Sequence, residues 1–157
     1  MNTSHCTVLL VEDNPDDVLL TRRAFMRANL LNPIQAIEDG DKAIAYLAGN
    51  PPFEDRDRYP MPVLVLLDLK LPRRTGLEVL KWIRSVPTLK PLPVVVLTSS
   101  SENTDINSAY DLGANSYLVK PVGFDALFDM VKILQPYWLI MNKQPFSGGV
   151  PETVGRM

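Results

Sequence analysis

Four short apolar runs in this sequence are each followed at once by one or two side chains that can take part in chemistry. These side chains are Glu12, Asp13, Asp68, Thr98 and Lys120. An ionised carboxylate directly after five consecutive apolar residues, as at Asp68, is costly to hold unless polar partners satisfy it. A turn capped by the aspartate is the simple explanation, because aspartate often accepts hydrogen bonds from nearby backbone N–H groups. The other four side chains favour a shared polar site instead.

Three carboxylates that lie close together require positive charge. Two unit charges roughly 4 Å apart repel by about 4 kcal/mol at an effective dielectric near 20. Lys120 supplies one charge, and Mg²⁺ is a hard cation that suits oxygen ligands and leaves positions open for phosphate oxygens. Carboxylates, a metal ion, a lysine and a hydroxyl group form a phosphoryl-transfer arrangement. In this arrangement Asp68 is the nucleophile, Glu12 and Asp13 hold the metal, and Thr98 donates a hydrogen bond to the product.

The same apolar runs predict the elements that must position these side chains. Their length, β-branched content and near-continuous apolarity favour strands of a parallel sheet covered on both faces. The expected strands span residues 7–11, 33–37, 63–67, 94–97 and 116–119. Segments with helical patterns fill the intervals, at residues 14–29, 40–49, 75–85, 102–113 and 123–134. Asn14 and Pro15 predict the start of the first helix, and Gly49 predicts the end of the second.

Strand and helix alternate five times along the chain. This order predicts a right-handed, doubly wound α/β sandwich, because parallel strands need crossover helices. The carboxyl ends of parallel strands lie at one edge of such a sheet, where ligands bind. The polar side chains that follow the strands are therefore expected to converge at that edge.

The composition argues against several other kinds of protein. The chain has 157 residues, of which 46% are apolar and 22% charged, as is typical of one globular domain. The net charge of −2 gives no reason to expect nucleic acid or an anionic membrane as partner, and no apolar run suits a signal peptide or a membrane span. With Cys6 and His5 as the only cysteine and histidine, neither a disulfide, a zinc site nor histidine-based nucleophilic catalysis is expected. A reducing, cytoplasmic location is expected.

Four sequence blocks resemble, in order and spacing, the signature blocks of two-component receiver domains. The blocks are "LLVEDNPDD", "VLLDLKLPRRTGLEVL", "VVVLTSS" and "GANSYLVKPV", and the resemblance covers roughly residues 6–135. It implies a flavodoxin-like (βα)₅ domain, the fold of the chemotaxis regulators, with strand order 2-1-3-4-5. It also implies a signalling protein that accepts a phosphoryl group itself, rather than an enzyme acting on other molecules.

The resemblance implies roles for the residues around the acceptor. Asp68 would accept the phosphoryl group from a histidine kinase, and Thr98 and Lys120 would bind that group. Tyr117 matches the aromatic residue that swings inward as Thr98 moves, and Lys120–Pro121 matches the family's cis peptide bond.

The resemblance also implies a metal site. Asp13, Asp68 and the backbone carbonyl of Lys70 would hold Mg²⁺, and Glu12 would act through a water molecule. Some residues near the acceptor tune the lifetime of the acyl phosphate or the access of the kinase. By the resemblance, these residues would be Lys70, Ser99 and Ser100.

A Pro-rich, charged stretch at residues 49–62 is longer than a compact receiver needs and predicts an exposed loop. Partner recognition and mere insertion both explain such a loop. Long loops here, with the blocks "NPDD" and "LPRRTGLEVL", are similar to the small regulators paired with cyanobacterial and bacterial phytochromes. The kinase implied by that similarity is a phytochrome.

The receiver domain is expected over residues 5–141, followed by a flexible tail over 142–157 that is too short for a DNA-binding output domain. The apolar segment 137–140 would either finish the core or form a self-association surface. A homodimer is expected, through the C-terminal segment and the face formed by the helix at 102–113, the strand at 116–119 and the helix at 123–134.

Three alternatives stand beside this interpretation. A receiver-like interaction or dimerisation module would keep the fold without depending on phosphorylation of Asp68. A phosphatase of the haloacid dehalogenase type needs a second acid two residues after its nucleophile, where this chain has Lys70. A flavodoxin needs phosphate donors after the first strand, and Glu12 and Asp13 would repel phosphate there.

Overall fold

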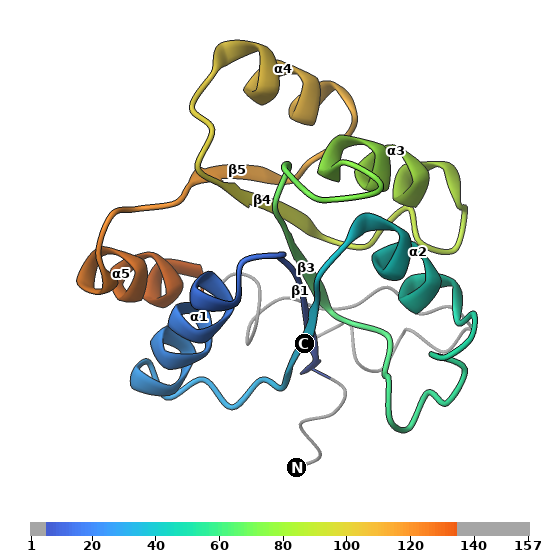
Figure 1. Cartoon of the computed structure of the whole chain (residues 1–157), viewed down its shortest axis with the longest axis horizontal. Coiled ribbons are helices and arrows are strands. Elements are labelled where there is room, and N and C mark those ends of the chain that lie inside the picture. Colours follow the sequence, from blue (N-terminus) through green and yellow to red (C-terminus); the bar gives the residue numbers. More distant parts are fainter. Residues whose placement is uncertain (1–5, 135–157) are drawn as a thin grey trace, which may run out of the picture.

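Each apolar run predicted as a strand forms one. The computed structural model describes residues 6–134. Its strands are β1 (Val8–Val11), β2 (Ile34–Ile37), β3 (Leu64–Leu67), β4 (Val94–Thr98) and β5 (Ser116–Val119). They pair in parallel in the order β2-β1-β3-β4-β5, which confirms the doubly wound, flavodoxin-like fold (Figure 1). All side chains of β1, β3 and β4 are buried, because helices cover both faces of the sheet.

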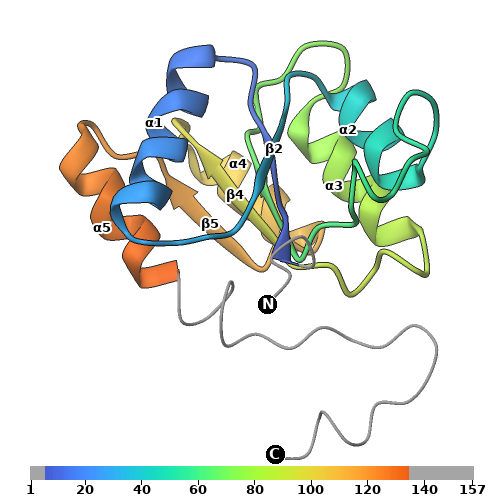
Figure 2. The ribbon, with the colours of Figure 1, turned by 90° about the horizontal axis from the view of Figure 1, so that it is seen from below.

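Helices follow the strands in strict alternation. They are α1 (Pro15–Arg27), α2 (Gly40–Ala48), α3 (Gly76–Ser85), α4 (Asn103–Asp111) and α5 (Phe124–Leu134). Helices α1 and α5 pack on one face of the sheet, and α2 and α3 pack on the other (Figure 2). Alternate residues of β4 divide accordingly, since Val94 contacts the α2–α3 core and Val95 the α1–α5 core. Val96 and Ala109 place α4 on the same face as α3.

Short polar signals set the ends of the helices. The side chain of Asn14 accepts a hydrogen bond from the backbone N–H of Asp16, with Pro15 at the first helical position, as predicted. Helix α2 ends at Gly49, which adopts the left-handed conformation with φ of 75°. Helix α3 begins with a capping box between Thr75 and Glu78. These ends determine where each helix leaves the sheet and returns to it.

The carboxyl ends of the strands carry the candidate residues. The backbone N–H of Asp68 donates to the carbonyl oxygen of Val11 (3.0 Å), and the N–H of Lys120 donates to the carbonyl oxygen of Thr98 (2.7 Å). The sheet ladder therefore continues one residue past β3 and β5. This continuation brings the side chains of different strands to a common edge, as expected for a parallel sheet.

The stretch at 49–62 packs more closely than an exposed loop. Phe53 is buried and its ring lies against the rings of Tyr46 and Tyr59, with centroids 5.3 and 5.1 Å away. The guanidinium of Arg56 donates to the carbonyl oxygens of Tyr46 and Leu47 at the end of α2. The expected exposure therefore holds for most of the charged residues and for Pro51 and Pro52. By contrast, Pro62 is buried, and Phe53 is buried and Tyr59 partly buried because aromatic residues bury large apolar surfaces.

The expected limits of the domain at 5 and 141, and the tail at 142–157, lie outside the described residues. Within residues 6–134, no helix has the length and apolarity needed to cross a membrane.

Candidate functional site

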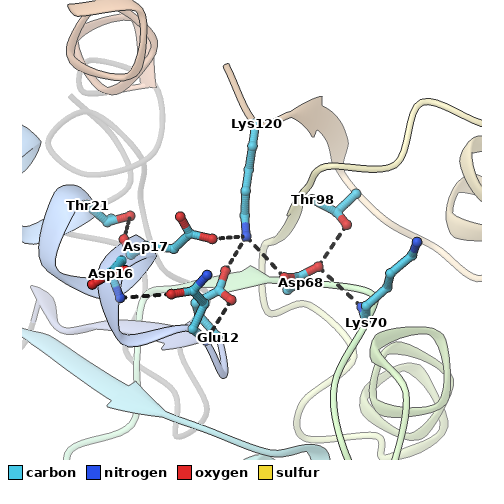
Figure 3. A network of polar contacts seen from close by, with 9 residues as sticks. Glu12, Asp16, Asp17, Thr21, Asp68, Lys70, Thr98 and Lys120 are labelled. Atoms are coloured by element: carbon cyan, nitrogen blue, oxygen red, sulfur yellow. Dashed lines mark hydrogen bonds and ion pairs between the residues drawn. The ribbon is translucent and has the colours of Figure 1, made fainter. Parts of the chain in front are cut away.

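Asp68 lies just beyond the end of β3 and is 7% exposed. Its Oδ1 accepts a hydrogen bond from the Thr98 hydroxyl group (2.7 Å) and another from the backbone N–H of Lys70 (3.2 Å). Its Oδ2 accepts one from the Nζ of Lys120 (3.1 Å). Figure 3 shows the three donors arranged around this carboxylate. The buried charge is thus compensated by side chains that the parallel sheet brings from two other strands.

The contacts of Asp68 decide its protonation. Burial raises the pKa of this carboxyl, but the Thr98 hydroxyl and the Lys120 ammonium together outweigh burial and leave the pKa below its usual value. Asp68 is therefore ionised at neutral pH, which is the form in which a carboxylate acts as a nucleophile.

Lys120 occupies the centre of the site. Its Nζ contacts Glu12, Asp17 Oδ2 (2.9 Å) and Asp68 Oδ2 (3.1 Å), so each of the three N–H donors of the ammonium has a carboxylate acceptor. Burial lowers the pKa of Lys120, but these carboxylates outweigh burial and raise the pKa above its usual value. The lysine stays charged over the whole physiological range of pH.

Asp17 was missed by sequence reasoning as a residue of this site. By sequence alone, Asp16 and Asp17 are favourable negative charges in the first turn of a helix. A signal was nevertheless present, because Asp17 lies in the first turn of α1, close in the sequence to Glu12 and Asp13 at the end of β1.

Glu12, Asp13 and Asp68 form an acidic cluster. Each offers a carboxylate oxygen, and these oxygens lie within 4.8 Å of one another. Burial raises the pKa of Glu12 to about 7, against the lowering effect of Lys120 and of the Asn14 backbone N–H. An exposed and a buried carboxylate beside Asp68 form the oxygen donor set that a hard divalent cation prefers, so the residues present fit Mg²⁺.

Tyr117 and Ser100 lie on the side of the site that faces α4. The hydroxyl group of Tyr117 donates to the backbone carbonyl oxygen of Ser100 (2.8 Å), and its ring packs against the small cluster of Leu69, Val96 and Ala109. The Ser100 hydroxyl donates to Asp105 Oδ2. Tyr117 thus connects β5 to the loop that follows Thr98.

The remaining predicted residues lie at the rim. Ser99 is exposed, and the exposed side chain of Lys70 extends away from Asp68, which only the backbone N–H of Lys70 contacts (Figure 3). The expected cis bond at Lys120–Pro121 is wrong, because the cis peptide bond recorded within residues 6–134 is Pro51–Pro52. The trans form at residue 121 is the one that X–Pro bonds intrinsically favour.

The sequence matches the response regulator receiver domain model over residues 8–132. It is 40% identical over 138 residues to the probable methanogenesis regulatory protein FilR2 of Methanothrix harundinacea, covering 88% of this chain and 86% of that protein. It is 38% identical over 132 residues to the response regulator Rcp1 of Synechocystis sp., covering 84% of this chain and 88% of that protein.

Solved structures agree with the sequence matches. The phosphorylated cyanobacterial phytochrome response regulator RcpA is 38% identical, with a TM-score of 0.83 over 90% of this chain and 99% of that chain. The Mn²⁺-bound form of Rcp1 is 36% identical, with a TM-score of 0.80 and the same coverage. The matched family spans most of the chain, and the fold agrees with it. The chain therefore belongs to the response regulator receiver domain family, with single-domain phytochrome response regulators among its close relatives.

Proposed function

We propose that this protein is a single-domain response regulator that accepts a phosphoryl group on Asp68 from a histidine kinase. The observation that carries the proposal is the environment of Asp68. Thr98 Oγ1 lies 2.7 Å from one oxygen of this buried carboxylate, and Lys120 Nζ lies 3.1 Å from the other. One carboxylate oxygen from each of Glu12, Asp13 and Asp68 lies within 4.8 Å of the other two.

The residues of the site account for each bond that forms and breaks in the proposed phosphoryl transfer. A carboxylate oxygen of Asp68 forms the new O–P bond, while the N–P bond of the kinase phosphohistidine breaks and its electron pair stays on the imidazole nitrogen. The Lys120 ammonium and the Thr98 hydroxyl donate to the phosphoryl oxygens, on which negative charge gathers. Burial of Asp68 limits the access of water to the acyl phosphate.

We propose that Asp13, Asp68 and the backbone carbonyl of Lys70 hold Mg²⁺ directly, with Glu12 acting through a water molecule. When bound, the cation offsets the charge of the carboxylates and of the incoming phosphoryl group. The donor set of the cluster supports this assignment, as does the Mn²⁺-bound form of the relative Rcp1.

We propose that phosphorylation acts on the face formed by α4, β5 and α5. Thr98 would move toward the new oxygens, and Tyr117, whose hydroxyl group now donates to the carbonyl oxygen of Ser100, would fill the vacated space. Tyr110 on α4 and Val119 on β5 are 50% and 40% exposed, and a homodimer is proposed through this face. The C-terminal segment that would complete the dimer surface lies outside the described residues.

The proposed kinase is a phytochrome. The support for this proposal is the similarity to RcpA, a cyanobacterial phytochrome response regulator, over 90% of this chain. A cytoplasmic location is proposed with it.

The function is tested by incubating the protein with Mg²⁺ and acetyl phosphate and measuring its intact mass. Wild type is expected to gain one phosphoryl group, and Asp68→Asn is expected to gain none, because the nucleophilic carboxylate is lost. Asp111→Asn removes an exposed acid from α4 and should behave as wild type. A wild-type protein that gains no mass would favour the alternative, a receiver-like module that acts without phosphorylation.

Lys70→Asn is expected to shorten the lifetime of the phosphorylated protein several-fold while leaving uptake intact. The exposed Lys70 ammonium can turn toward a phosphoryl group on Asp68 and hinder an attacking water molecule, whereas asparagine is shorter and uncharged. Loss of the phosphoryl group after removal of the donor, followed by mass, gives the decay rate. Lys81→Asn, at an exposed position of α3, is the control, and equal decay rates for Lys70→Asn and wild type would refute this role.

A further inference from the structure

Asp17 on α1 is a partner of Lys120 that lies outside the acidic cluster. Given the proposed phosphoryl transfer, on which this inference rests, we infer that Asp17 is a positioning residue that holds the Lys120 ammonium beside Asp68. Asp17 Oδ2 lies 2.9 Å from Lys120 Nζ. Figure 3 shows Asp17 and Asp68 on opposite sides of the ammonium, one from α1 and the other from the end of β3.

The other two carboxylates that contact Lys120, those of Glu12 and Asp68, have further roles in the proposed reaction. Glu12 and Asp68 both belong to the acidic cluster, and Asp68 is also the proposed acceptor. Asp17 is absent from that cluster, and its carboxylate contacts Lys120 alone among the described side chains. When Glu12 and Asp68 serve the proposed cation and phosphoryl group, Asp17 is therefore the carboxylate that stays with Lys120.

A fixed partner matters because lysine is flexible. Its ammonium sits on a four-carbon stem, and a lysine held by one contact samples many positions. Lys120 side-chain exposure is 17% and that of Asp17 is 35%, so the pair is partly screened from water and its attraction is stronger than that of a surface pair. An ammonium that is already in place before transfer lowers the barrier by orientation.

The space around Asp17 and Lys120 allows Asp17→Glu to serve as a conservative replacement. A cavity of about 70 Å³ between α1 and the start of α5 borders both Asp17 and Lys120. Because of this space, the additional methylene group of Asp17→Glu can be accommodated while the carboxylate is kept. Asp16 provides the matched control, since it lies in the same helical turn and its exposed carboxylate contacts no other described residue.

The first test compares rates of phosphorylation by acetyl phosphate with Mg²⁺ in wild type, Asp17→Asn, Asp17→Glu and Asp16→Asn. Asp17→Asn is expected to be slower by about five- to tenfold, as for a misplaced catalytic group. Asp16→Asn should stay within about twofold of wild type, because exposed charges have small effects. Asp17→Glu should recover most of the rate. Circular dichroism confirms that each variant is folded.

The second test observes the ¹⁵Nζ resonance of Lys120 by NMR in the metal-free protein. In wild type its hydrogens should exchange slowly with water, and Asp17→Asn should speed this exchange while Asp16→Asn does not. A rate of phosphorylation in Asp17→Asn equal to that of Asp16→Asn, or faster than wild type, would overturn the positioning role. A wild-type protein that takes up no phosphoryl group overturns the proposed function itself, and the role of Asp17 falls with it.

Discussion

Lys120→Met is expected to lower the free energy of unfolding of the metal-free protein by about 3 kcal/mol at neutral pH, the lower end of the cost of breaking a buried ion pair. The variant keeps the apolar stem but leaves Glu12, Asp17 and Asp68 without their shared cation. The side chains of Glu12 and Asp68 are only 4% and 9% exposed, so solvent replaces little of the lost interaction. Urea denaturation with a chelator present measures the loss.

The loss at Lys120→Met should depend on pH. Asp68 has a pKa below its usual value in the folded wild type, so it stabilises the fold above the unfolded pKa, and this contribution falls away as the pH drops through the folded pKa. Glu12 has a raised pKa of about 7, so its ionised form costs stability that appears as the pH rises from the unfolded pKa through about 7. Without Lys120 both carboxyls should titrate higher, so the deficit should be largest near about pH 8 and shrink toward about pH 5.

Lys70→Met is the matched control for this prediction. Lys70 also lies beside Asp68, but its ammonium is exposed and extends away from the carboxylate. Its replacement should change the free energy of unfolding by less than about 0.5 kcal/mol, as is usual at the surface. Equal and small losses for the two variants, or a loss at Lys120→Met that grows as the pH falls, would contradict the central role of the Lys120 ammonium.

Gly76→Ala is expected to destabilise the protein by about 3 kcal/mol, the upper range for overpacking. Gly76 begins α3, and a Cβ there would overlap the backbone carbonyl oxygen of Asp68 and lie 2.7 Å from Leu69 Cα. The obstacles are backbone atoms, which cannot rotate away as a side chain can. Within a helix, alanine is more favourable than glycine by up to about 1 kcal/mol. A loss of stability in Gly76→Ala would therefore be due to the clash.

The clash at Gly76→Ala should also affect phosphorylation of Asp68. Relief requires the segment that carries Asp68 to move, so the rate of phosphorylation by acetyl phosphate should fall along with the thermal midpoint. Gly123→Ala is the control, because no heavy atom lies within 4 Å of its added Cβ and its φ of 97° causes only local strain. This control should lose about 1–2 kcal/mol of stability and keep the rate of uptake. A Gly76→Ala protein as stable as wild type would contradict this prediction, because it would show that the backbone at Asp68 can move at little cost.

Most of the fold could be predicted from local patterns. The five apolar runs match the strands to within one residue, as for the run at 63–67 and β3 at Leu64–Leu67. Asn14 and Gly49 correctly marked a helix start and a helix end. These features were predictable because strand burial and helix capping depend on residues close together in the sequence.

The candidate site was predictable to the extent that it follows from sheet geometry. Parallel strands end at a common edge, so Asp68, Thr98 and Lys120 had to lie near one another once the strands were recognised. The structure does bring their side chains into contact. Their roles in phosphoryl transfer remain predictions that the experiments above address.

Contacts between distant elements could not be predicted from local sequence patterns. Asp17 was recognisable as a first-turn acid, but its contact with Lys120 depends on how α1 packs beside the end of β5. The burial of Phe53 and the trans bond at Pro121 also differ from what sequence patterns suggested. Periodicity and capping are set by neighbours along the chain, whereas the reach of a long side chain depends on the distance between elements, which is set when the layers pack together.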